Sequence, residues 1–238
     1  MTWPLAADPA GSATGLTDVL LNSWILSWDA QQLLTNPLGL YQANIFYPHP
    51  DTLTYSENLF GLAPLALLLK LFGAGPLLSH NLIFLLTFPL TGWAGWWWIR
   101  RSTGSWFGGL VAGLVFAFCP FKMGHPDHLQ LQAAWWFPLS LLALGLYLQN
   151  FRLKYLIWLG VCFIGQWLCC LYYGLFMTLA LAACLGLALA GRSELRSARR
   201  LIEMGLVGAV AVLILVGLLW PSFNLPDQGF ARGAAEIK

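Results

Sequence analysis

The first residues that could do chemistry lie near the N-terminus, in LTDVLLNSWILSWDAQQLL (16–34), which we expect to be a helix. At about 100° per residue, one face carries two carboxylates and two amides within about 40° of Asp18: Asp18, Asn22, Asp29 and Gln32. This face is either the wet side of an amphipathic helix on the membrane or the lining of a cavity. In the second case Asp18 or Asp29 would act as a general base or a metal ligand.

A second polar segment, IFYPHPDTLTYSENLFG (45–61), follows this helix. Its prolines stiffen the chain and favour extended or turn conformations. His49, Asp51 and Glu57 could join Asp18 in a site for a divalent metal ion, although their spacing matches no established metal motif. Alternatively, Glu57 stabilises the N-terminal end of the apolar helix that follows it, through the helix dipole.

The third polar segment, FKMGHPDHLQ (121–130), concentrates ionisable side chains within seven residues: Lys122, His125, Asp127 and His128. Lys122 could bind a phosphate group or extend towards the membrane interface. The spacing of the histidines is too compact for a zinc motif by itself. The segment therefore predicts either a ligand-binding loop or a polar hairpin between two membrane spans.

The composition shows that these segments belong to a protein that is surrounded by lipid. Hydrophobic residues make up 58% of the 238 residues and charged residues only 9%, whereas soluble domains carry about 25% charge. This excludes a soluble enzyme, and the net charge of +2 excludes a nucleic-acid partner, which needs a basic surface. The partner is a lipid bilayer. The five cysteines lie in apolar runs without metal-site spacing, so we expect small buried side chains.

Six apolar segments are long enough, or nearly long enough, to cross a bilayer: 78–99, 106–120, 132–149, 154–171, 173–190 and 201–220. We therefore predict an all-α, polytopic bundle of about six transmembrane helices, with amphipathic or re-entrant helices on its outer face. The predicted divisions are an outer loop region (1–77), the bundle (78–220) and an outer tail (221–238).

The basic residues predict the orientation of the bundle. Eight of the twelve lie in alternate loops: Arg100, Arg101, Arg152, Lys154, Arg192, Arg196, Arg199 and Arg200. The positive-inside rule makes these loops cytoplasmic and puts the three polar segments outside. The apolar stretch 59–73 contains Gly61, Pro64 and Lys70, and no Lys or Arg precedes it. We therefore expect it to lie at the outer face without spanning.

Several motifs together resemble one superfamily. They are, in order, the acidic helix, NIFYPHPDTLTYSE (44–57), WIRRSTGS (98–105), GGLVAGLVFAFCPFK (108–122) and HPDHLQLQAAWWFPL (125–139). Over about residues 16–236 the chain resembles bacterial polytopic proteins of the GT-C glycosyltransferase superfamily, especially their uncharacterised members. Because such proteins have a span before the first outer loop and continue beyond this C-terminus, the chain is expected to be a fragment.

The resemblance implies a bacterial cytoplasmic-membrane enzyme that takes a sugar from a polyprenyl-phosphate donor on the outer face. It implies that Asp18, and secondly Asp29, is the catalytic acid of the first outer loop. Asp127 and His128 correspond loosely to polar residues of the next outer loop, and Lys122 would face the donor phosphate. A divalent cation could be held by Asp18. The alternatives are a non-catalytic protein that handles or flips lipid, and a structural membrane subunit.

Overall fold

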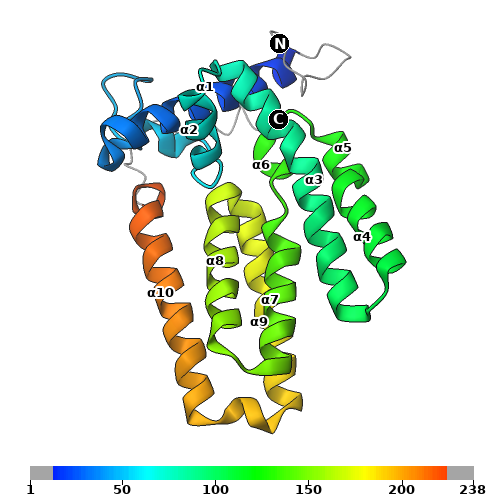
Figure 1. Cartoon of the computed structure of the whole chain (residues 1–238). Helices are drawn as coiled ribbons and strands as arrows, with labels where there is room; N and C mark the ends of the chain where they lie inside the picture. Colours follow the sequence, from blue (N-terminus) through cyan, green and yellow to red (C-terminus); the bar gives the residue numbers. More distant parts are fainter. Residues whose placement is uncertain (1–12, 224–238) are drawn as a thin grey trace, which may run out of the picture.

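The computed structural model describes residues 13–223, and within this range it contains helices and turns but no strand (Figure 1). Its helices are α1 (Ala13–Thr35), α2 (Ala63–Leu71), α3 (Pro76–Thr103), α4 (Trp106–Phe118), α5 (Pro120–Gly124), α6 (Leu129–Gln132), α7 (Trp136–Asn150), α8 (Leu153–Cys169), α9 (Leu171–Gly191) and α10 (Ala198–Phe223). Short 3₁₀ turns occur at Pro37–Gly39, Thr52–Tyr55 and Ser193–Arg196. The all-α prediction is confirmed. Most of the predicted outer tail lies outside the described residues.

Five segments are long and apolar enough to cross a membrane: Pro76–Thr103, Trp106–Gly124, Leu129–Asn150, Leu171–Gly191 and Ala198–Ser222. The sequence predicts six. The remaining one, α8, is apolar but has 17 residues, so it extends about 26 Å at 1.5 Å per residue. The protein is therefore an integral membrane protein, with α8 packed between α7 and the longer α10 (Figure 1).

The helices α3 and α4 form a closely packed hairpin at one side of the bundle (Figure 1). Gly104 ends α3 in the left-handed conformation, and the Ser105 hydroxyl caps α4 by accepting a hydrogen bond from the Gly108 N–H at 2.9 Å. A Cβ atom added at Gly113 would lie 2.7 Å from the carbonyl oxygen of Gly92. The two helices can approach this closely because glycine lacks a side chain.

The helices α1 and α2 lie across one end of the bundle, which we call the outer end (Figure 1). The nine residues of α2 extend only about 14 Å, which is too short to cross the hydrocarbon core. Lys70 of α2 donates a hydrogen bond to the side chain of Gln31 in α1 at 2.8 Å. The expectation that 59–73 does not span agrees with this geometry.

The main hydrophobic core joins this outer layer to the upper ends of the spans. Ile25 and Leu26 of α1, Leu62 before α2 and Ile83 of α3 are each at most 1% exposed and belong to one cluster. The outer layer therefore covers this end of the bundle, and the burial of its apolar side chains holds it there.

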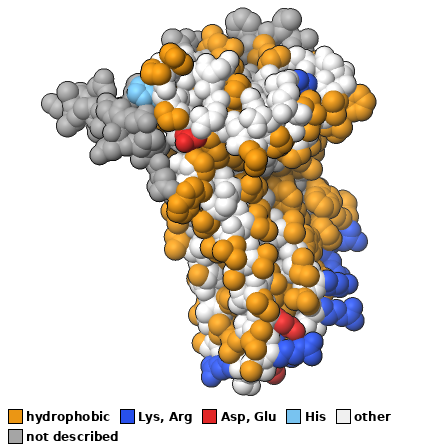
Figure 2. Space-filling view, turned by 90° about the vertical axis from the view of Figure 1, so that its left-hand side faces the viewer, with side chains coloured by type: hydrophobic (Ala, Val, Ile, Leu, Met, Phe, Trp, Pro, Cys, Tyr) orange, Lys and Arg blue, Asp and Glu red, His pale blue; other side chains and the backbone are white. Residues whose placement is uncertain are grey.

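The opposite end of the bundle, which we call the basic end, carries the loops with the eight basic residues that set the predicted orientation. In Figure 2 most of the visible Lys and Arg side chains lie along one side of the lower half of the apolar trunk and at its base. Two of them bind free backbone carbonyls at the C-terminal ends of helices. Arg192 donates to the carbonyl of Leu148 at 2.7 Å, and Arg196 donates to the carbonyls of Leu189 and Ala190. Cations at helix C-termini satisfy free carbonyls and favour the dipole.

A labelling experiment checks the orientation of the two ends. In a variant without native cysteines, single cysteines at Asn44 and Ser193, both exposed, should react with a membrane-impermeant maleimide from opposite sides. We expect Asn44→Cys to be labelled in intact cells and Ser193→Cys only after permeabilisation, because the basic loops stay in the cytoplasm. Labelling of both positions from the same side would contradict the arrangement.

Candidate functional site

Three of the sequence-predicted residues meet at the outer end: Asp18 of α1, and Asp127 and His128 of the loop between α5 and α6. One ligand atom from each lies within 4.8 Å of the others. His128 Nε2 lies 3.8 Å from Asp18 Oδ2, and His128 Nδ1 lies 3.0 Å from Asp127 Oδ1. The imidazole therefore sits between two carboxylates. All three side chains are partly exposed, so substrates and ions can reach them.

Two amides hold this cluster, which we call the outer cluster, in place. Asn22, one helical turn after Asp18, donates a hydrogen bond to the backbone carbonyl of Asp127 at 3.2 Å. The buried Gln132 donates to the carbonyls of Lys122 at 3.1 Å and His125 at 2.6 Å. The first amide ties α1 to the loop, and the second fixes the fold of the loop itself.

Glu57 is a fourth ionisable group near the outer cluster. Burial raises the pKa of its carboxyl to about 7, while the backbone N–H of Leu171 and the charge of His128 act to lower it. Leu171 is the first residue of α9, so the carboxyl lies at that helix N-terminus. The expectation that Glu57 stabilises the start of the 59–73 helix is wrong, because α2 begins only at Ala63 and has no acidic residue in its first turn.

Asp29 does not belong to the outer cluster. It is eleven residues from Asp18, which is about 16 Å along the helix axis, and its side chain is fully buried. Neither carboxyl oxygen has a hydrogen-bond partner among the described residues, and burial raises the pKa of Asp29 to about 8. The interpretation of this helix face as wet along its whole length is wrong: Asn22 and Asp29 are buried, and only Asp18 and Gln32 are partly exposed.

The remaining sequence candidates lie elsewhere. Asp51 exchanges two hydrogen bonds with the side chain of Gln42, Nε2 to Oδ1 at 2.5 Å and its own N–H to Oε1 at 3.2 Å. Of the expected metal ligands Asp18, Asp51 and Glu57, only Asp18 is in the group that could hold a metal ion.

Lys122 is buried inside the bundle, whereas His125 lies beside the outer cluster. Lys122 is 2% exposed, and its ammonium lies 4.7 Å from the ring centre of Phe88 and 3.5 Å from the Thr91 hydroxyl of α3. The structure therefore does not present Lys122 to a phosphate at the outer surface. His125 packs against Phe121, with ring centres 4.5 Å apart, and its ring centre lies 6.2 Å from that of His128.

Sequence reasoning missed Gln132, which lies in LQLQAAWW. An amide among apolar residues is a signal of a buried hydrogen-bonding group, because a buried amide needs partners. Its two partners could not be identified from spacing, since they are backbone carbonyls on the far side of the loop.

Asp29 should make stability depend on pH. The unfolded carboxyl ionises near pH 3.8, but the folded one keeps its proton up to about pH 8. The folded state therefore binds more protons across this window, and the free energy of unfolding should fall as pH rises, by on the order of 5 kcal/mol at most. In Asp29→Asn the fall between pH 5 and 8 should be smaller, with Glu57 causing part of what remains. Thermal unfolding in detergent at several pH values measures this, and parallel profiles would exclude a buried acid at Asp29.

Comparison with known proteins identifies a family whose model matches most of this chain. The family described as "Domain of unknown function (DUF6311)" matches residues 28–237. No curated protein and no solved structure matches the chain at a significant level. The matched range includes Glu57, Asp127 and His128, whereas Asp18 lies before it.

Proposed function

The chain belongs to the DUF6311 family, whose function is unknown, and from this premise we propose that it is a membrane glycosyltransferase. It would transfer a sugar from a polyprenyl-phosphate donor to an acceptor on the outer face of a bacterial cytoplasmic membrane. One observation carries the proposal: an acid from the first polar segment and an acid–histidine pair from the third meet within 4.8 Å at the outer end.

In the proposed reaction, an acceptor hydroxyl attacks the anomeric carbon of the donor sugar. The bond from this carbon to the phosphate oxygen breaks, and polyprenyl phosphate leaves with the bonding electrons. Asp18 takes the hydroxyl proton as general base. Asp127 orients the imidazole of His128 through the 3.0 Å contact, and the other ring nitrogen faces Asp18, so His128 can accept the proton from Asp18 afterwards.

The outer layer carries exposed apolar side chains that suit a lipid-linked donor. Leu68, Leu71 and Phe72 around the end of α2 are 52%, 65% and 82% exposed; this end of α2 contacts α1 at Gln31, about 20 Å along the helix from Asp18, a distance that the head of the donor would have to span. The donor tail can thus stay in the bilayer while its phosphate and sugar reach the polar end. This is the support for a lipid carrier over a soluble nucleotide sugar.

A divalent cation is the alternative use of the same residues. Two carboxylates and one imidazole suit Mn²⁺ or Zn²⁺, and such an ion would neutralise the donor phosphate. Chelation distinguishes the two roles. If Asp18 is the base, transfer should survive EDTA; if the cluster holds a cation, transfer should stop and return on addition of Mn²⁺ or Zn²⁺.

The proposal is tested with membranes that contain the protein and a radiolabelled polyprenyl-phosphate sugar. We expect label to leave the lipid fraction and polyprenyl phosphate to accumulate, relative to membranes without the protein. The rival function is lipid handling without chemistry. Fast movement of a fluorescent phospholipid across proteoliposomes, with no sugar release and no effect of Asp18→Asn, would favour that rival.

A further inference from the structure

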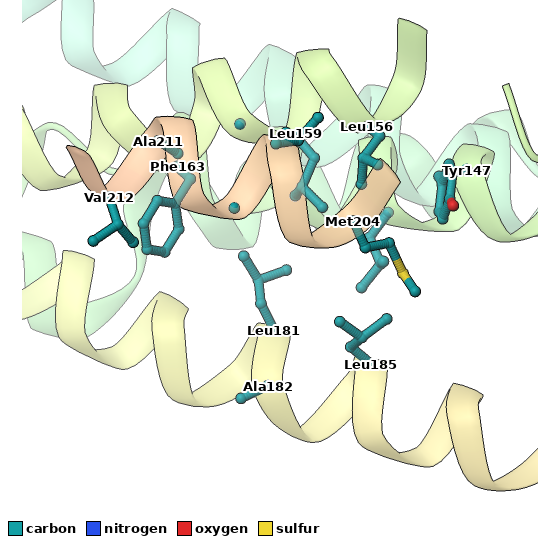
Figure 3. A pocket seen from close by; sticks show the side chains of 14 residues that line it. Tyr147, Leu156, Leu159, Phe163, Leu181, Ala182, Leu185, Met204, Ala211 and Val212 are labelled. Atoms are coloured by element: carbon teal, nitrogen blue, oxygen red, sulfur yellow. The ribbon is translucent and has the colours of Figure 1, made fainter. Parts of the chain in front are cut away.

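An apolar groove runs between α8, α9 and α10, in the half of the bundle nearer the basic end. Its volume is about 240 Å³. In Figure 3, Leu181 and Leu185 of α9 face Phe163 of α8 and Met204 of α10 across this space. Nearly all of its lining is hydrocarbon, so the occupant must also be apolar where it contacts the groove.

One polar group lies at the end of the groove nearer the basic end. Tyr147 of α7 lines the groove and is fully buried, and its hydroxyl has no hydrogen-bond partner among the described residues. Because protein atoms enclose this hydroxyl, an occupant of the groove does not reach it, and the polar head of the occupant must be held by groups outside the groove.

Cations border the same end. Met204 lies one helical turn from Arg200, whose guanidinium stacks over the ring of Phe151 at 3.7 Å. Arg196, in the turn between α9 and α10, uses two N–H groups to cap α9. A guanidinium has five N–H donors, so each arginine keeps donors for an anion.

Acidic side chains do not neutralise this region. Its carboxylates are Glu194 and Glu203, against six basic residues where α7 joins α8 and α9 joins α10: Arg152, Lys154, Arg192, Arg196, Arg199 and Arg200. Glu203 already pairs with Arg199 at 2.8 Å. The excess positive charge lies at the level of a phospholipid headgroup, while the groove lies at the level of its acyl chains.

We propose that the groove binds one acyl chain of an anionic phospholipid from the leaflet at the basic end, with the lipid phosphate bound by Arg196 and Arg200. This site is at the opposite end of the bundle from the outer cluster. It therefore needs no sugar transfer and holds whether or not the protein is a transferase.

Two glycines of α10 provide a matched test of the groove. Gly208 lines it, and a Cβ atom added there meets no atom within 4 Å. Gly205 is equally free of neighbours but does not line the groove. Gly208→Leu should fill part of the groove without a clash and weaken lipid retention about a hundredfold, as if a few methylene groups were displaced. Gly205→Leu should retain lipid like the wild type.

Native mass spectrometry of the detergent-purified protein with added phosphatidylglycerol or phosphatidylcholine measures retention. We expect one tightly retained phosphatidylglycerol and weaker binding of phosphatidylcholine. Arg196→Gln with Arg200→Gln should reduce the preference for phosphatidylglycerol by about thirtyfold and leave phosphatidylcholine unchanged.

Three outcomes would overturn the proposal. Equal retention in Gly208→Leu and Gly205→Leu would exclude the groove. Equal retention of the two lipids by the wild type would exclude the arginines as the headgroup site. A dimer of the wild type that Gly208→Leu dissociates would mean that a second copy occupies the groove.

Discussion

Asp18→Asn is expected to lower sugar transfer by about 10²–10⁴-fold, the usual cost of losing a general base. The Asp18 side chain is 41% exposed and its carboxylate lies 3.8 Å from His128 Nε2, so the amide removes charge and basicity with little change in packing. Expression, helicity and membrane insertion should therefore match the wild type. The measurement is initial transfer from a polyprenyl-phosphate sugar in membranes adjusted to equal amounts of protein.

The neighbouring acids supply the controls for this prediction. Asp29→Asn should change transfer much less per folded molecule, because Asp29 is buried about 16 Å along α1 from Asp18. Asp127→Asn should have an intermediate effect, since it removes the contact that orients His128. Undiminished transfer in Asp18→Asn, or a greater loss in Asp29→Asn, would show that the outer cluster is not the catalytic centre.

Gly61→Val is expected to destabilise the fold by about 3 kcal/mol, the upper range for overpacking. A Cβ atom at this position would lie 2.4 Å from Cys169 Sγ and 2.8 Å from the backbone nitrogen of Cys169. The Gly61 N–H also donates to the carbonyl of Leu168 at 2.7 Å. The backbone of α8 cannot move aside as a flexible side chain would, so the segment that carries Glu57 must separate from the bundle.

Gly75→Val is the matched control, because Gly75 has an extended backbone and a Cβ atom there meets no atom within 4 Å. Thermal unfolding in detergent should show a clear loss for Gly61→Val and little change for Gly75→Val. Similar unfolding temperatures for the two variants would mean that the outer layer does not pack on the end of α8 as described.

The helical bundle could be predicted because its signals are local. Long apolar segments, helix-ending residues such as Gly104 and the alternation of basic loops are each contained within a few turns of chain. The predicted segment 154–171 is helical as α8, and its 17 apolar residues are at the lower limit of the length of a span.

The candidate site was predicted only in part. Angular spacing puts Asp18 and Asp29 on one face of α1, and this holds for the helix. It does not reveal that Asp29 is fully buried while Asp18 faces the loop of Asp127. A helical wheel gives the angle of each side chain around the helix axis, but it does not show which other elements pack against each turn.

By itself, the sequence determined that this protein is an all-α membrane protein whose basic loops gather at one end and whose polar segments gather at the other. These properties follow from the transfer of each segment between water and lipid, which depends on local composition. Only the tertiary structure decided that Asp18 meets Asp127 and His128, that Asp29 and Lys122 are buried, and that Glu57 lies at the start of α9. The physical reason is that burial and charge contacts depend on which helices pack together, and that packing is set by apolar contacts between residues far apart in the chain.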